Sequence, residues 1–296
     1  MFSQKRSKLN YYFTKYCIIP TKILRTSIVD TIRHDGIEHA GYLAFLLLLS
    51  FFPFLIFVIS IIGIFSTSEA GMQVVEAIVT SVPKEMAQGL YPYINEIVSG
   101  PPHSLLTIAI IGVIWTASSS VEGCRTILNR AYRVAFPPPY ILRRFFAILE
   151  FFVITFVIIS GVVIFVILPS FLSGWEEKFL AKLHFDYHIF HLRHMIFLGI
   201  LTCATSLLYY ALPNAKQKIT QTLPGSILSV ILWVALERVF TLYLTNFDQV
   251  NFVYGSLAGI IIALMFFYFI SVVFILGAEF NYHFHRIYQV FLKERK

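Results

Sequence analysis

Charge is scarce in this chain. Only 13% of its 296 residues are Asp, Glu, Lys or Arg, whereas 57% are hydrophobic and the mean hydropathy is +0.75. A typical soluble domain has about 25% charged residues, so the composition excludes an ordinary soluble protein and predicts one embedded in a membrane. The first 38 residues are polar and basic, and the apolar runs recur along the whole chain. A cleaved signal peptide therefore does not account for the hydropathy.

Cysteine is also rare. The three cysteines, Cys17, Cys124 and Cys203, form no CxxC or other paired spacing. Their spacing argues against a disulfide framework and against a cysteine-based zinc site.

Long apolar runs dominate the rest of the chain. Six of them are long enough to cross a bilayer core of about 30 Å as helices that rise about 1.5 Å per residue. They cover residues 40–65, 104–133, 141–168, 194–212, 223–244 and 254–280, to within a few positions. The last two are joined only by Thr245–Val253, so we expect a tight antiparallel pair.

The fold class that follows is all-α. We predict a polytopic membrane protein with a bundle of six transmembrane helices in residues 40–281, preceded by a basic amphipathic segment, 1–39, and followed by a basic tail, 282–296. Apolar residues recur at helical spacing in the long loop Ser66–His103, which predicts two short amphipathic helices at the membrane interface.

Lysine and arginine are distributed unevenly. The N-terminus, the second-to-third loop, the fourth-to-fifth loop and the tail hold 18 of the 23, against four on the opposite side. The positive-inside rule therefore places both termini in the cytoplasm. The net charge of +7 then faces anionic lipid headgroups, which we expect as partners in place of nucleic acid. A homo-oligomer stays open.

Ionisable groups inside a membrane are costly, so those in the predicted spans are candidates for function. They are Glu150, Glu237, Arg238 and Glu279. Adjacent side chains on a helix point about 100° apart, so we expect Glu237 and Arg238 each to find a partner on another helix or in a hydrated cavity. The polar positions Thr116 and Ser120 are candidates for that contact. The set either lines a substrate path or forms an internal ion-pair network.

Proline and small residues predict how the spans bend and pack. Pro53 removes a backbone donor inside the first span, which produces either a gating hinge or a static kink; we favour the kink. Small side chains let helices approach closely in lipid. The predicted packing positions are Gly112, Gly255, Gly259 and Ala263.

Histidines crowd the region before the fourth span, at positions 184, 188, 191 and 194. On a helix they would share an arc of about 120°, and imidazoles so spaced can bind one metal ion. No cysteine or well-placed carboxylate completes a set with His184, His188 and His191. We therefore favour interfacial histidines and expect no metal and no cofactor.

The stretch HDGIEH, His34–His39, is the nearest approach to a metal-dependent nuclease set. Asp35, Glu38 and His39 could share one helical face. Gly36 and the position at the entry to the first span favour helix-start electrostatics instead. We expect the protein not to be an enzyme.

Six motifs recur in a characteristic order. They are LLLLSFFPFL (Leu46–Leu55), LNRAYRV (Leu128–Val134), LYYALPN (Leu208–Asn214), LPGSILSVILW (Leu223–Trp233), VYGSLAG (Val253–Gly259) and LGAEFN (Leu276–Asn281). Together they resemble the YihY/BrkB family of bacterial inner-membrane proteins, which also carries the label ribonuclease BN. The resemblance covers about residues 30–285 and implies six transmembrane helices in the inner membrane. The family often has an Arg-Gly pair early in the LNRAY helix. This chain reads SSSVEG there, so no role for that arginine is transferred.

Three classes of function remain. A transporter or lipid-handling protein is favoured, because members of the family have been linked to envelope lipids and serum resistance. A non-catalytic assembly or structural factor of the envelope is the alternative. A ribonuclease, as the old label says, has the weakest support, since nuclease chemistry needs clustered metal-binding side chains.

Overall fold

The computed structural model describes residues 19–64, 104–136, 138–162, 186–246 and 258–293, and every element in these ranges is an α-helix. The helices are α2 (Ile19–Arg33), α3 (Gly36–Ile64), α6 (Ser104–Ala131), α7 (Tyr140–Val162), α9 (Asp186–Ala211), α10 (Ile219–Asn246) and α12 (Ala258–Lys293). The all-α prediction is confirmed for this part of the chain. The interfacial helices predicted between 66 and 103 lie outside it.

Two helical segments, Ile219–Leu244 and Ala258–Ile287, are long and apolar enough to cross a membrane. Gly36–Phe51 and Met195–Ala211 are shorter apolar segments. A complete set of six spans stays a prediction.

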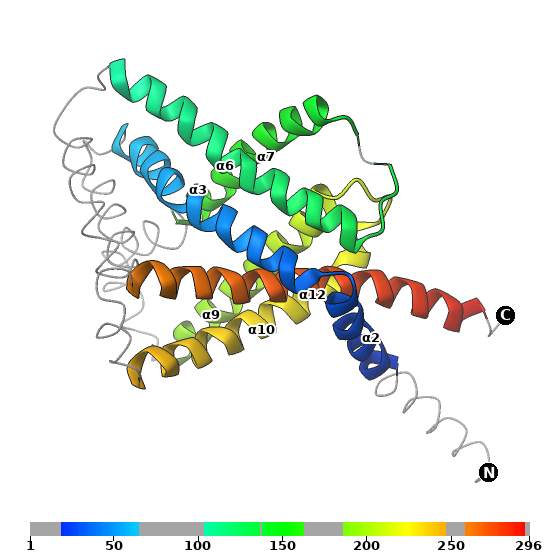
Figure 1. The fold of residues 1–296 in the computed structure, drawn as a ribbon. Helices are drawn as coiled ribbons and strands as arrows, with labels where there is room; N and C mark the ends of the chain where they lie inside the picture. Colours follow the sequence, from blue (N-terminus) through cyan, green and yellow to red (C-terminus); the bar gives the residue numbers. More distant parts are fainter. Residues whose placement is uncertain (1–18, 65–103, 137, 163–185, 247–257, 294–296) are drawn as a thin grey trace, which may run out of the picture.

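Helix α12 organises the bundle. It packs against α10, α3, α2 and α6, while α9 packs on α10 and α7 on α6. Figure 1 shows α12 running through the middle of the molecule, with α6 on one side and α10 on the other, while α9 crosses it in this view. The start of α2 and the last turns of α12 lie at the same end of the molecule (Figure 1).

Several helix bounds differ from the predicted ones. Helix α9 begins at Asp186, well before His194, and α12 continues to Lys293 through most of the predicted tail. Hydropathy detects only the stretch that lipid accepts, whereas a helix continues wherever its backbone bonds and a packing partner support it. Here α2 supplies the partner, because Ile23, Ser27 and Thr31 form its buried face and it packs on α12 and α3.

A close helix crossing joins α10 to α12 at Gly225 and Gly277. A Cβ on Gly225 would overlap the Gly277 carbonyl oxygen, and one on Gly277 would overlap the Ser229 and Tyr209 hydroxyls. Tyr209 of α9 donates to the Phe274 carbonyl at 2.7 Å and thereby ties a third helix to this crossing. Sequence reasoning passed over both glycines.

The predicted packing positions differ in how closely they pack against neighbouring helices. A Cβ on Gly112 would meet no described atom within 4 Å, so Gly112 is not at a close crossing there. Ala263 is buried and Gly259 is half-buried. Gly255 lies outside the described residues.

Helices α3 and α6 contact each other through two serine hydroxyl groups, just before Pro53 along α3. The Ser50 and Ser120 hydroxyls lie 2.6 Å apart, and both donate to the Leu46 carbonyl. Thr116 instead bonds the Gly112 carbonyl of its own helix. Helix α3 runs through Pro53 to Ile64, and a hinge at this proline stays a prediction.

Candidate functional site

A pocket of about 460 Å³ opens at one end of the bundle. Three separate segments line it: the turn after α6, the connection between α9 and α10 with the first turn of α10, and the last third of α12. The distribution of Lys and Arg predicts that these three segments lie on the same side of the membrane. In the structure they line one pocket. The lining residues are Tyr132, Arg133, Val134, Asn214, Ala215, Lys216, Gln217, Gln221, Asn281, Tyr282, His285 and Arg286.

The lining of this pocket is basic. Arg133, Lys216 and Arg286 carry positive charge, His285 adds an imidazole, and the lining includes no Asp or Glu. Amide side chains and two phenols complete it. The Tyr132 phenol supplies an O–H that can donate a hydrogen bond. The pocket therefore has the charge and the hydrogen-bond donors to hold an anion.

Asparagines on three motifs hold the pocket wall in place. Asn129 and Asn214 form a reciprocal pair, in which the Asn129 amide donates to the Asn214 side chain at 3.1 Å and accepts from its backbone N–H at 2.7 Å. Asn281 accepts from the Gly225 N–H at 2.6 Å and donates to the Tyr132 hydroxyl at 3.2 Å. The LNRAYRV, LYYALPN, LPGS and LGAEFN motifs therefore meet at one place.

Arg133 stands in the left-handed turn that ends α6. Its φ is 57°, and the Val134 N–H closes the turn on the Asn129 carbonyl at 2.8 Å. A left-handed conformation costs a residue with a Cβ about 1 kcal/mol. The side chain offsets this cost, because the guanidinium binds both oxygens of Glu279 at 2.8 and 3.0 Å. Such paired, charge-assisted bonds are among the strongest in proteins.

The contacts of Arg133 define a cluster at the junction of α2, α6 and α12, here called the Arg133 cluster: Asp30, His34, Arg133, Glu279 and His283. The Arg133 guanidinium lies 3.6 Å from Asp30 and 3.2 Å from His34, and 4.9 Å from the centre of the Tyr282 ring. Glu279 is almost fully buried, at 2% exposed. The structure thus makes Glu279 part of an interhelical ion-pair network.

A second buried cluster surrounds Arg125 of α6, which is 2% exposed. The guanidinium forms an ion pair with Glu150 of α7 and lies 3.5 Å from Glu122. It also donates to the Leu212 carbonyl at 3.1 Å and to the Arg143 carbonyl at 2.7 Å. This Arg125 cluster joins α6 to α7 and to the end of α9, and gives Glu150 an internal partner.

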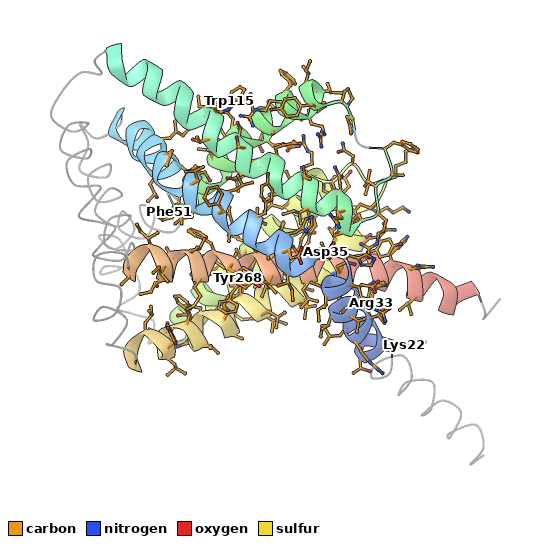
Figure 2. The ribbon with its side chains drawn as sticks, in the orientation of Figure 1. Lys22, Arg33, Asp35, Phe51, Trp115 and Tyr268 are labelled. Atoms are coloured by element: carbon orange, nitrogen blue, oxygen red, sulfur yellow. The ribbon has the colours of Figure 1, made fainter. Side chains whose placement is uncertain are left out.

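The residues considered for a nuclease lie at the surface. Arg130 donates to the Asp35 carboxylate at 2.9 Å and lies 2.8 Å from the His39 ring nitrogen, while Glu38 is exposed. Figure 2 shows Asp35 at the turn between α2 and α3, where α3 crosses α12. The structure therefore gives Asp35 and His39 a role in holding this turn against α6.

Glu237 and Arg238 are on the outer face of α10. Their side chains are 60% and 81% exposed and lie 3.6 Å apart, and Glu237 also contacts Thr241 of the same helix at 3.5 Å. Within the described residues, the structure brings neither side chain to a polar group on another helix. The expected contact with Ser120 and Thr116 is therefore not formed.

The histidine region is only partly described. His188 and His191 are within α9, but their side chains and the whole of His184 lie outside the described part of the chain. Metal binding there stays untested.

Sequence reasoning missed the residues that build the site. Arg133 and His283 received no individual role, and Asn281 served only as part of a motif. The signal that could have found them is the recurrence of Arg, Asn, Tyr and Glu within otherwise apolar motifs, at helix ends that the charge distribution already placed on one side.

Comparison with known proteins identifies the family. The family model described as virulence factor BrkB matches residues 28–295. The putative ribonuclease-like protein YfkH of Bacillus subtilis is 25% identical over 258 residues, 86% of this chain and 91% of that protein.

Relatives with a plainer name are UPF0761 membrane proteins. That of Alteromonas mediterranea is 25% identical over 84% of this chain and 83% of its own length, and that of Aeromonas salmonicida is 28% identical over 83% of each. No solved structure matches the chain. The chain belongs to the BrkB family of membrane proteins.

Proposed function

We propose that this protein binds an anionic amphiphile of the cell envelope, with the acidic headgroup in the basic pocket, as part of transporting or remodelling that lipid. The observation that carries the proposal is the pocket itself, whose lining holds Lys216, Arg286 and His285, beside an Arg133 already paired with Glu279, and no carboxylate. Its volume lies in the range of about 300–1,000 Å³ that is usual for small-ligand sites. A phosphate-bearing headgroup fits both its size and its charge.

The surroundings of the pocket support a position at headgroup depth. Two residues beyond the pocket wall, Phe136 is 93% exposed, and Tyr140 and Ile141 follow as further exposed apolar side chains. Aromatic side chains are enriched at the membrane–water interface. A pocket at this level meets the headgroup while the acyl chains stay in lipid.

Ligand binding by the purified full-length protein tests the proposal. The probes are lysophosphatidylglycerol, glycerol 3-phosphate and inorganic phosphate, measured by thermal shift and by native mass spectrometry. We expect the lysolipid to raise the melting temperature most, because the headgroup and the chain both contact the protein. If free phosphate binds equally well, the ligand is a soluble anion.

A matched pair of variants locates the binding. Lys216 lines the pocket, whereas Lys218, two residues along the same connection, is exposed and does not. Lys216→Gln should weaken lysolipid binding about tenfold, the effect of losing about 1.4 kcal/mol, and Lys218→Gln should leave it within about twofold. Equal effects from the two variants would show only non-specific attraction to positive charge.

A structural role in the envelope is the second candidate. The Arg125 cluster and the Arg133 cluster connect helices by ion pairs that need no ligand. This role predicts that Lys216→Gln complements a deletion strain fully, while a change at Arg125 lowers protein abundance. Loss of complementation by Lys216→Gln at normal abundance supports the lipid-binding role instead.

Ribonuclease activity is a further hypothesis, suggested by the name of the relative YfkH. We expect no metal-dependent RNA cleavage by the purified protein above that of a variant in which Asp35, Glu38 and His39 are all Ala. Cleavage that the triple substitution abolishes would establish the enzyme.

A further inference from the structure

We infer that Asp30, Glu279 and His283 form a binding site for a divalent transition-metal ion, which would fasten α2 to α12 beside the basic pocket. One carboxylate oxygen from each acid and one ring nitrogen of His283 lie within 4.8 Å of one another. The His283 Nε2 atom is 2.9 Å from the Asp30 oxygen and 3.8 Å from the Glu279 oxygen. The three ligands come from helices at opposite ends of the sequence.

The imidazole of His283 points to a ligand independently of the two acids. The residue is 5% exposed, and its Nε2 atom makes no hydrogen bond although the Asp30 oxygen is near. The oxygen lies off the direction in which an N–H or a lone pair would project. A buried polar atom without a partner destabilises the fold, and a metal ion bound in that direction would satisfy it.

The spacing of the donor atoms suits a small ion. Zinc binds imidazole nitrogen and carboxylate oxygen at about 2.1 Å, so two of its ligands lie about 3.0–3.4 Å apart in octahedral or tetrahedral geometry. The distances from His283 Nε2 to the Asp30 oxygen, 2.9 Å, and to the Glu279 oxygen, 3.8 Å, lie on either side of this range. One imidazole with two carboxylates favours Zn²⁺ or Mn²⁺ over Ca²⁺, which prefers ligand sets made only of oxygen.

The Arg133 cluster holds two carboxylates and one guanidinium, so its charge favours a bound cation. Asp30 and Glu279 contribute two negative charges, and the Arg133 guanidinium balances one of them. Each carboxylate oxygen has two lone pairs, so Glu279 can keep its bonds to Arg133 and bind an ion on its other side. The competing occupant is a proton on His283, and metal binding distinguishes the two.

The experiment measures ion binding to the full-length protein in detergent after treatment with a chelator and desalting. We expect one Zn²⁺ or Mn²⁺ per chain by elemental analysis, with a rise in melting temperature. His283→Gln and Asp30→Asn should weaken binding at least tenfold. The matched controls His39→Gln and Asp35→Asn change the same residue types at the Arg130 contact and should bind as the wild type does.

A last variant tests whether His188 and His191 of α9 bind the ion instead. The double change His188→Gln, His191→Gln should retain the ion, and it does not alter the buried cluster. Two results overturn the inference: a wild-type protein that takes up no ion, or loss of the ion in the α9 double variant with normal uptake by His283→Gln.

Discussion

Arg125 offers the sharpest test of what holds this bundle together. We consider Arg125→Met, which keeps the length of the side chain and removes its charge. The change leaves the carboxylates of Glu150 and Glu122 without their buried cation, and removes the donors from the carbonyls of Leu212 and Arg143. Glu122 keeps its contact with Arg143. No other described cation forms an ion pair with Glu150.

The magnitude follows from burial. Breaking a buried ion pair by removing one partner costs about 3–5 kcal/mol. The Glu150 and Glu122 side chains keep 22% and 13% exposure, so partial hydration places the expected loss at the lower end, about 3 kcal/mol. At about 2–4 °C per kcal/mol for a large domain, the apparent melting temperature should fall by about 6–12 °C.

The control is Arg130→Met on the same helix. Arg130 and its partner Asp35 are each about half exposed, and an exposed pair contributes about 0–1 kcal/mol. Melting of both variants in detergent, followed by intrinsic fluorescence, compares them directly. If Arg125→Met melts within about 2 °C of Arg130→Met, the buried cluster does not stabilise the fold and the reasoning fails.

Three further predictions concern packing, surface charge and topology. Gly277→Ala should lower the melting temperature through about 1–3 kcal/mol of overpacking, because its Cβ would overlap two hydroxyl groups, while Gly112→Ala should not; equal melting of the two would contradict the close crossing. Glu237→Gln should change stability in detergent by less than about 1 kcal/mol, since the pair it leaves is exposed; a large loss of abundance would mean that another subunit covers this face. In intact cells, the Lys216→Cys variant should show no more labelling by an impermeant maleimide than the wild type does; additional labelling would contradict the predicted orientation.

The sequence by itself determined the class of this protein. Low charge and recurrent long apolar runs can be satisfied in lipid only by segments whose backbone bonds are internal, which means helices here. The uneven distribution of Lys and Arg grouped the turn after α6, the connection before α10 and the end of α12, and the structure brings those segments to one pocket.

Tertiary structure decided which charged groups are internal. Helix α10 is apolar around nearly its whole circumference, so its pattern did not reveal that Glu237 and Arg238 face outward. Hydropathy estimates depth along a helix, whereas the exposed side depends on which neighbours it packs against. Arg133 and Glu279 meet across 146 positions of sequence, and no local periodicity predicts such a contact. The Arg133–Glu279 ion pair, the closely crossing glycines and the buried His283 exist only because α12 packs against α2, α6 and α10 at once.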